Sequence, residues 1–116
     1  MFHELRTYHC KPQHVLRFVE RTRDRTLPLW ADHDFQLVGF WRTMVGPLMD
    51  VVYMLAWRDM AHCERAWGSF QADARWLRIK AETEAETGPW VDGIDTVFLS
   101  PAEFSPLGGA EADGTG

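Results

Sequence analysis

The chain has 116 residues, of which 46% are hydrophobic and 25% charged, and its formal net charge is −5 at pH 7. This length and balance predict one globular domain with its own core and argue against a disordered chain. The acidic charge gives no support to a nucleic-acid partner, and no apolar stretch approaches the ~20 residues that span a bilayer, so we expect a cytoplasmic protein without nucleic-acid or membrane partners.

The first part of the chain predicts a strand followed by a helix. Residues 2–9 (FHELRTYH) alternate and contain aromatic, β-favouring side chains, which indicates a strand. Lys11-Pro12 opens a helix, since proline is tolerated in a first turn. The helix has an apolar stripe of Val15, Phe18, Val19, Thr22 and Thr26, and a solvated face is expected for Arg17, Glu20, Arg21, Asp24 and Arg25. Pro28 is expected to end or kink it, and residues 29–33 to add a further helical turn.

The remainder predicts a hairpin, a helix and a last strand. Residues 35–45 and 51–57 read as strands joined by a turn at Gly46-Pro47, which makes the pair antiparallel. Asp59 is a good N-cap for the next helix, which Gly68-Ser69 is expected to bend and Gly88-Pro89 to stop. Residues 93–100 form the last predicted strand, and the tail 108–116 is expected to be disordered.

This order of elements predicts an α+β, ferredoxin-like βαββαβ fold, with a four-stranded antiparallel sheet and two helices on one face, over residues 1–107. The strand at 35–45 is apolar on both of its faces. We expect the helix-free face of the sheet to carry Trp41, Tyr53, Leu55 and Trp57, or their neighbours. A second copy of the sheet is the simplest cover for such a face, which predicts a homodimer.

Five short blocks in the chain resemble the NIPSNAP family: ELRTYHCKP, LPLW, LVGFW, GPL with VVYMLAW, and FSPL at 104–107. The resemblance implies membership of the dimeric α/β-barrel superfamily, which includes cofactor-free monooxygenases, muconolactone isomerase, polyketide cyclases and aldoxime dehydratase. These relatives share a pocket within each subunit but differ widely in chemistry. Tyr53, Leu55 and Trp57 replace the residues usual in the family, which indicates a specialised pocket.

Three polar side chains share one face of the first strand by the period of two: Glu4, Arg6 and Tyr8. If Leu5 and Thr7 pack on the helices, the three point into the barrel as base, oxyanion stabiliser and proton donor. A purely structural ion pair between Glu4 and Arg6 is the alternative.

Aromatic residues of the hairpin are the candidate substrate wall. Tyr53 and Trp57 point the same way and could stack a flat substrate that the Tyr53 hydroxyl orients, or they could be core residues. Leu55, Trp41 and Thr43 would complete this wall. Asp50 is either a surface turn residue or a base at the pocket rim, and His33 with Asp34 is either an acid–base pair or a capping pair.

No residue set predicts a bound cofactor or metal. The five histidines lack a helical i, i+4 pair or another ligand spacing, and Cys10 and Cys63 read as free thiols. We therefore expect a small-molecule enzyme that performs cofactor-free acid–base chemistry on an aromatic or polyketide-like substrate, as an isomerase, cyclase, lyase or oxygenase. The alternative is a non-catalytic module that binds a ligand or a protein. A buried, titrating carboxylate beside a roomy pocket favours the enzyme, and a pocket filled by Trp41, Trp57 and Phe40 favours the module.

Overall fold

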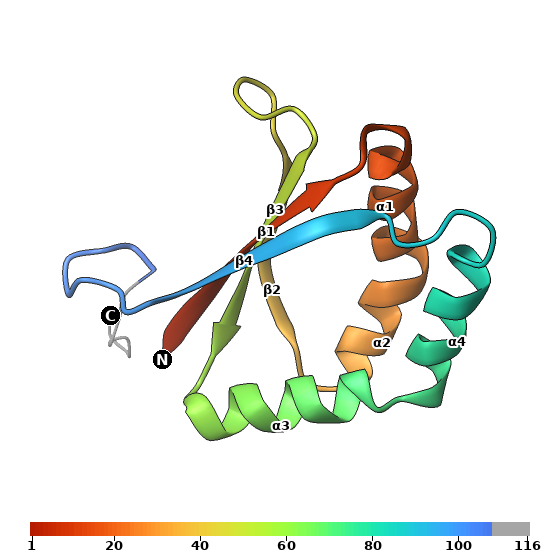
Figure 1. The fold of residues 1–116 in the computed structure, drawn as a ribbon. Coiled ribbons are helices and arrows are strands. Elements are labelled where there is room, and N and C mark those ends of the chain that lie inside the picture. The colour runs from red at the N-terminus through yellow and green to blue at the C-terminus, as the bar shows by residue number, and fades with distance from the viewer. Residues whose placement is uncertain (108–116) are drawn as a thin grey trace.

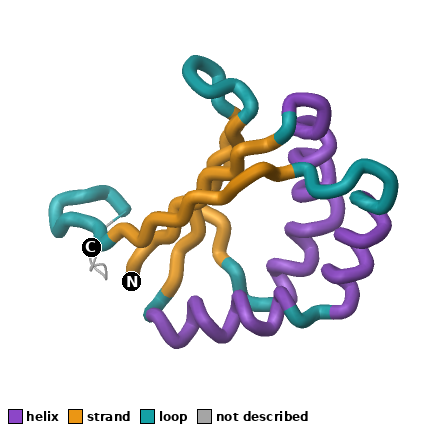
Figure 2. Tube along the Cα trace, in the orientation of Figure 1, coloured by secondary structure: helices purple, strands orange, loops and turns teal. Residues whose placement is uncertain are grey.

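The computed structural model describes residues 1–107, so the predicted disorder of the tail 108–116 lies outside the described residues. The elements follow one another as β1 (Phe2–Cys10), η1 (Pro12–His14), α1 (Val15–Arg21), η2 (Thr22–Thr26), α2 (Leu27–Asp32), β2 (Gln36–Arg42), β3 (Asp50–Trp57), α3 (Met60–Gln71), α4 (Ala74–Thr83) and β4 (Val91–Leu99). Figure 1 shows the strands crossing as one twisted layer with the helices on one side of it, and Figure 2 shows the same layers by element type.

The four strands form one antiparallel sheet in the order β2-β3-β1-β4. The first strand is therefore central, and it pairs with β3 on one side and β4 on the other. This topology confirms the predicted ferredoxin-like α+β fold. It also places the side chains of β1 in the middle of any cavity between sheet and helices.

The register of β1 and β3 places the polar residues of β1 on the helix-covered face. Glu4 lies opposite Leu55, and Arg6 lies opposite Tyr53. Directly opposed residues share a face, and Tyr53 packs against Trp30 of α2 with ring centroids 5.2 Å apart. The expectation named Tyr53, Leu55 and Trp57 or their neighbours, and it is neighbours such as Val52 and Met54 that lie on the helix-free face. Leu5 and Thr7 lie opposite Met54 and Val52, so the condition that they pack on the helices is not met.

Trp41 does lie on the opposite face, because β2 is irregular. The pairing shifts between Leu37 and Gly39, and after this shift Phe40 opposes Tyr53 while Trp41 opposes Val52. A bulge of this kind interrupts the alternation on which a sequence pattern depends. Trp41 folds back over Gly39, where an added Cβ would lie 2.5 Å from the indole ring. Only glycine leaves room for the ring there.

The first helical segment continues past Pro28 instead of ending there. A wider π-type turn at η2 precedes α2, and the N–H of Leu27 donates to the carbonyl of Thr22. Pro28 then lies in the first turn of α2, where its missing N–H breaks no helical hydrogen bond. The predicted helical turn at residues 29–33 is confirmed within α2.

The second helical segment consists of two helices, α3 and α4, which are separated after Gln71. The Asp59 side chain accepts from the His62 N–H, which confirms the predicted cap of α3. The helix runs through Gly68 and Ser69 without interruption and ends at Gln71. The break lies at Asp73, whose side chain accepts from the Arg75 N–H and begins α4. The cap at Asp73 thus marks the start of a separate helix.

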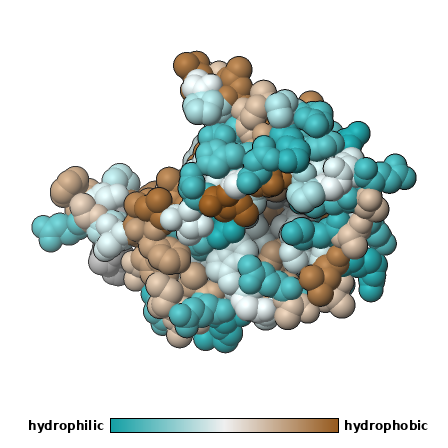
Figure 3. Space-filling view, viewed as in Figure 1, coloured by the Kyte–Doolittle hydropathy of each residue, from teal (hydrophilic) through white to brown (hydrophobic). Residues whose placement is uncertain are grey.

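The helix-free face of the sheet is apolar and has no cover within the described chain. Trp41 is 49% exposed there and Val97 of β4 is also 49% exposed. The loop between β2 and β3 projects from the body, and Figure 3 shows apolar atoms gathered at its tip, where Met44 and Val45 are exposed. Within residues 1–107, no helix combines the length and the apolar character needed to cross a membrane.

Candidate functional site

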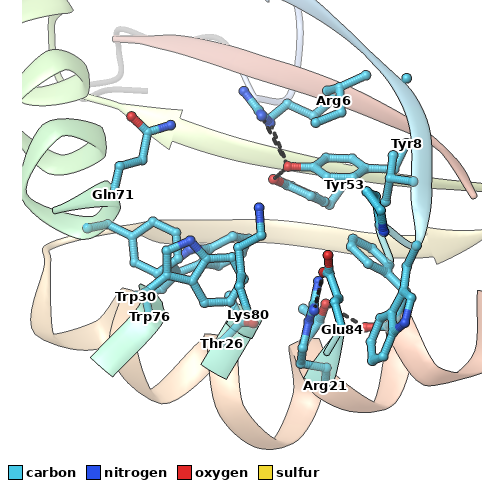
Figure 4. Close-up of a pocket in the computed structure, with 18 of the residues that line it drawn as sticks. Arg6, Tyr8, Arg21, Thr26, Trp30, Tyr53, Gln71, Trp76, Lys80 and Glu84 are labelled. Carbon is cyan, nitrogen blue, oxygen red and sulfur yellow. Dashed lines mark hydrogen bonds and ion pairs between the residues drawn. The ribbon is translucent and has the colours of Figure 1, made fainter. Parts of the chain in front are cut away.

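A cavity of about 410 Å³ lies between the sheet and the helices, on the face where β1 presents Arg6 and Tyr8. This volume is within the range of small-molecule sites. Its aromatic wall consists of Phe18, Trp30, Trp67, Phe70, Trp76 and Trp90. Figure 4 shows the polar groups on two sides of the space, with Arg6, Tyr8 and Tyr53 on one and Arg21 and Glu84 on the other.

Glu4 is buried behind this cavity and is fully engaged. One carboxylate oxygen, Oε1, accepts the indole N–H groups of Trp57 and Trp67, each at 2.9 Å. The other oxygen, Oε2, accepts from Arg6 at 3.0 Å. Glu4 is 2% exposed and is not part of the cavity wall. The expected general base therefore does not reach a molecule in the cavity, and its geometric effect is to position Arg6.

Arg6 connects Glu4 to the tyrosines. Its Nε and Nη2 donate to the Tyr8 hydroxyl at 3.2 and 3.0 Å. Its guanidinium also lies 4.4 Å from the ring centre of Trp67, a cation–π contact. Burial lowers the pKa of Arg6, but Tyr53, Tyr8 and Glu4 outweigh this effect and raise it, so the residue stays a cation.

The two tyrosine hydroxyls form a directed hydrogen-bond relay. Their oxygens lie 2.8 Å apart. A hydroxyl has two lone pairs and one proton, and both lone pairs of Tyr8 are occupied by Arg6. Donation from Tyr8 to Tyr53 is the direction that these two contacts favour, because the reverse direction would give the Tyr8 oxygen a third donor. The Tyr53 proton then has no acceptor among residues 1–107, and Tyr53 is part of the cavity wall.

Tyr53 is a donor at neutral pH. Its side chain is almost fully buried, and this burial, with Tyr8 beside it, raises the pKa of Tyr53 well above 10.0. The phenol therefore keeps its proton, and the relay from Arg6 through Tyr8 ends in an O–H group. Such a group can stabilise negative charge that develops on a substrate oxygen.

Arg21 and Glu84 form the opposite side of the cavity, which the sequence analysis missed. Arg21 Nη1 donates to Glu84 Oε2 at 2.6 Å, and its guanidinium lies 4.3 Å from the ring centre of Trp90. The expected solvated position of Arg21 is wrong, since its side chain is 5% exposed. The sequence did contain a signal for the buried position of Arg21. It follows the apolar Phe18 by three residues, and residues i and i+3 share a helix face.

Two buried N–H groups of the wall have no hydrogen-bond partner among the described residues. They are Nε of Arg21 and Nε1 of Trp30. Trp30 comes from α2 and stacks on Phe35, with ring planes 5° apart. Both side chains line the same cavity.

The other residues expected to form a substrate wall lie elsewhere. Leu55 and Trp57 are fully buried in the core. Trp41 lies on the helix-free face, and the Thr43 hydroxyl donates to the backbone carbonyl of Asp50. None of these residues lines the cavity. Of the expected site residues, Arg6, Tyr8 and Tyr53 do line it.

Asp50 and His33 are held in separate networks outside the cavity wall. The Asp50 carboxylate lies 2.8 Å from Nδ1 of His9. His33 contacts Asp73 at 2.7 Å and Ser69 at 2.8 Å, not the adjacent Asp34 of the expected pair. The Asp73–His33–Ser69 set has the atoms of a hydrolytic triad, but Ser69 lies inside α3 and its hydroxyl donates to the Ala66 carbonyl. This network joins α2 to the junction of α3 and α4.

The potential metal-binding side chains are dispersed. Within residues 1–107, no group of three or more His, Cys, Asp and Glu residues could hold a metal ion. Cys10 and Cys63 are both buried and free. Burial raises the pKa of each thiol to about 11, which leaves both as poor nucleophiles at neutral pH.

Comparison with known proteins identifies the family. The NIPSNAP family model matches residues 3–106. An uncharacterized NIPSNAP domain protein from Burkholderia xenovorans has a similar structure, with 28% identity, 91% of this chain and 99% of that chain covered, and a TM-score of 0.79. A NIPSNAP family protein of unknown function from Agrobacterium tumefaciens is 25% identical, with 92% and 93% covered and a TM-score of 0.81.

More distant structures share the fold alone. A proposed antibiotic biosynthesis monooxygenase from Nitrosomonas europaea is 15% identical, with 87% of this chain and 98% of that chain covered and a TM-score of 0.60. A search of curated proteins gave no match. The family match extends over almost all of the described residues and agrees with the five sequence blocks. The chain belongs to the NIPSNAP family.

Proposed function

We propose that the protein is an enzyme that binds a small aromatic ketone or phenol in the cavity and stabilises negative charge on its oxygen. The observation that carries this proposal is the hydrogen-bond relay Arg6–Tyr8–Tyr53. It ends at the cavity wall in the Tyr53 O–H group, which has no acceptor among residues 1–107. A donor held in place by a cation through a second hydroxyl suits an enolate or phenolate oxygen.

The proposed step is the removal of a proton from carbon beside a carbonyl group. The C–H bond breaks, its electron pair moves into the enolate, and the enolate oxygen accepts the hydrogen bond of Tyr53. Isomerisation, cyclisation, elimination and cofactor-free oxygenation can all begin with this step. The fold shared with a proposed monooxygenase is compatible with the last of these reactions but does not select it.

Glu84 is the proposed proton acceptor. Its Oε2 is bound by Arg21, while its Oε1 has no hydrogen-bond partner among residues 1–107. The side chain is 16% exposed and belongs to the cavity wall. Glu4, by contrast, already accepts hydrogen bonds from Arg6, Trp57, Trp67 and the Cys63 thiol. A base and an oxyanion donor on facing sides of one cavity are the two groups that enolisation needs.

Hydrogen–deuterium exchange tests this function without knowledge of the natural substrate. We expect the protein to accelerate exchange of the α-protons of 2-tetralone, a bicyclic aromatic ketone, in D₂O as followed by NMR. Tyr53→Phe should slow the catalysed exchange by about 10²–10³, and Glu84→Gln by about 10²–10⁴. Thermal melts of both variants separate this loss from unfolding.

The same experiment distinguishes an enzyme from a binding module. Saturable binding of 2-tetralone with exchange at the buffer rate would support the non-catalytic alternative. The observation against that alternative is that Trp41, Trp57 and Phe40 do not fill the cavity. These were the side chains whose presence in the pocket would have favoured a module.

We also propose that a second copy of the chain covers the helix-free face of the sheet. The support is the exposed apolar surface that includes Trp41 and Val97. Surfaces of this kind are uncommon on single chains in water. The likeness to the dimeric α/β-barrel superfamily favours pairing of two such faces.

A further inference from the structure

The charged residues around the cavity are paired, with one exception. Three ion pairs involve its wall: Glu4–Arg6, Arg21–Glu84 and Lys11–Asp92. Lys80 of α4 is an exposed residue that also lines the cavity, and its ammonium group has no ion-pair or hydrogen-bond partner among residues 1–107. Its side chain extends from α4 toward the tyrosine pair in Figure 4. The cavity thus has one unmatched positive charge.

A second and independent observation comes from α2. The indole Nε1 of Trp30 has no hydrogen-bond partner among the described residues, although Trp30 is only 4% exposed. An indole nitrogen is a donor only, so just an acceptor can satisfy it. A buried donor without a partner costs free energy. Because Trp30 lines the cavity, a bound molecule can supply the acceptor.

We infer that the molecule bound in this cavity is an aromatic carboxylate, held by Lys80 and the Trp30 indole N–H. This inference rests on the proposed function, in which the ring occupies the aromatic cavity and a second oxygen of the molecule faces Tyr53. One unmatched cation balances the single charge of a carboxylate, whereas a phosphate group carries nearly two negative charges at neutral pH.

The placement of the two donors is consistent with this orientation. Trp30 belongs to α2 and Lys80 to α4, whereas Arg6, Tyr8 and Tyr53 belong to the sheet. A molecule whose carboxylate meets Lys80 and Trp30 and whose carbonyl or hydroxyl meets Tyr53 uses donors from the helices and from the sheet. Such a molecule is a keto or hydroxy derivative of an aromatic acid.

The test compares 6-hydroxy-2-naphthoate with its uncharged methyl ester by titration calorimetry. In the wild-type protein we expect the acid to bind about tenfold more tightly than the ester, the effect of one charge-assisted contact. Lys80→Gln should bring this ratio close to one. Arg78→Gln is the matched control, since Arg78 is exposed on the same helix and is not part of the cavity wall.

A spectroscopic measurement reports on Trp30 directly. The indole N–H resonance of Trp30, assigned by its absence in Trp30→Phe, should move downfield when the acid is added and move less with the ester. Equal affinities of acid and ester, or a ratio that Lys80→Gln leaves unchanged, would overturn the inference. If neither naphthoate binds while 2-tetralone exchange is accelerated, this inference alone fails. If exchange is not accelerated and no probe binds, the proposed function fails with it.

Discussion

Trp57 of β3 and Trp67 of α3 donate their indole N–H groups to the same oxygen of Glu4, each over 2.9 Å. The sheet and a helix are thus joined through one buried carboxylate, whose other oxygen binds Arg6. The Cys63 thiol adds a fourth, weak donor at 3.9 Å, so the charge of this buried carboxylate is satisfied within the protein. A glutamine at this position would direct its NH₂ group at one of these donors in either orientation.

Glu4→Gln should therefore lower the free energy of unfolding by about 3 kcal/mol, since it breaks a buried ion pair and leaves Arg6 without its counter-charge. Urea unfolding measures this change. Glu82→Gln is the control, because Glu82 forms an exposed ion pair with Arg25 and should change stability by less than about 1 kcal/mol. Equal effects of the two substitutions would contradict the structural role assigned to Glu4.

Much of the fold could be predicted from the sequence because its signals are local. Period-two alternation placed Glu4, Arg6 and Tyr8 on one face, and the Asp59 cap marked the start of α3. Alternation alone does not say which face the helices cover. For this reason the sequence left open whether Tyr53 or its neighbours lie on the helix-free face, and the packing of Tyr53 against Trp30 answers this.

The remainder of the site depends on contacts between distant parts of the chain. Arg21 meets Glu84 across 63 positions, and His33 meets Asp73 across 40. A single sequence gives no measure of such pairings, so a mixed-charge helix suggested a solvated Arg21 and adjacency suggested a His33–Asp34 pair. The sequence also gives no signal for the β2 irregularity near Gly39, because the residues around it retain strand-like character.

The two thiols should be inert in the folded protein. Burial raises the pKa of Cys10 and Cys63 to about 11, so the reactive thiolate is scarce at neutral pH. Ellman's reagent at pH 7.5 should label neither cysteine in the native state and both in denaturant. Rapid native labelling would show that the core around the labelled cysteine opens readily.

His9 should make stability depend on pH. Its ring nitrogens each lie 2.8 Å from a carboxylate, and the hydrogen bonds to Asp95 and Asp50 raise the pKa of His9 above 6.5. Because the folded value exceeds the unfolded value, this contribution is complete below the unfolded pKa and is lost as pH rises through the folded one.

The melting-temperature difference between wild type and His9→Asn should therefore shrink from pH 6 to pH 9. An NMR titration of the His9 ring measures the folded pKa independently. A midpoint below 6.5, or a difference that does not vary with pH, would contradict the arrangement of His9 between the two carboxylates.

The helix-free face should control association. We expect a dimer by light scattering at micromolar concentration, and a monomer for Trp41→Asp, because a charge on this apolar face opposes pairing. Leu16→Asp is the matched control, since Leu16 is 57% exposed on α1, away from the sheet face. A wild-type monomer, or equal effects of both substitutions, would contradict the proposal.

The direction of hydrogen bonding in the relay, from Arg6 through Tyr8 to Tyr53, can be tested through the pKa of a bound phenol. The pKa of 4-nitrophenol, read from its visible absorbance in the complex, reports whether Tyr53 donates to the ligand oxygen. Burial in an apolar cavity alone raises the pKa of a phenol, whereas a donated hydrogen bond backed by a cation lowers it. The relay from Arg6 through Tyr8 to Tyr53 predicts a bound pKa below that of free 4-nitrophenol, and a return toward or above the free value in Tyr53→Phe. A bound pKa above the free value in the wild-type protein would contradict the assignment of Tyr53 as an oxyanion donor.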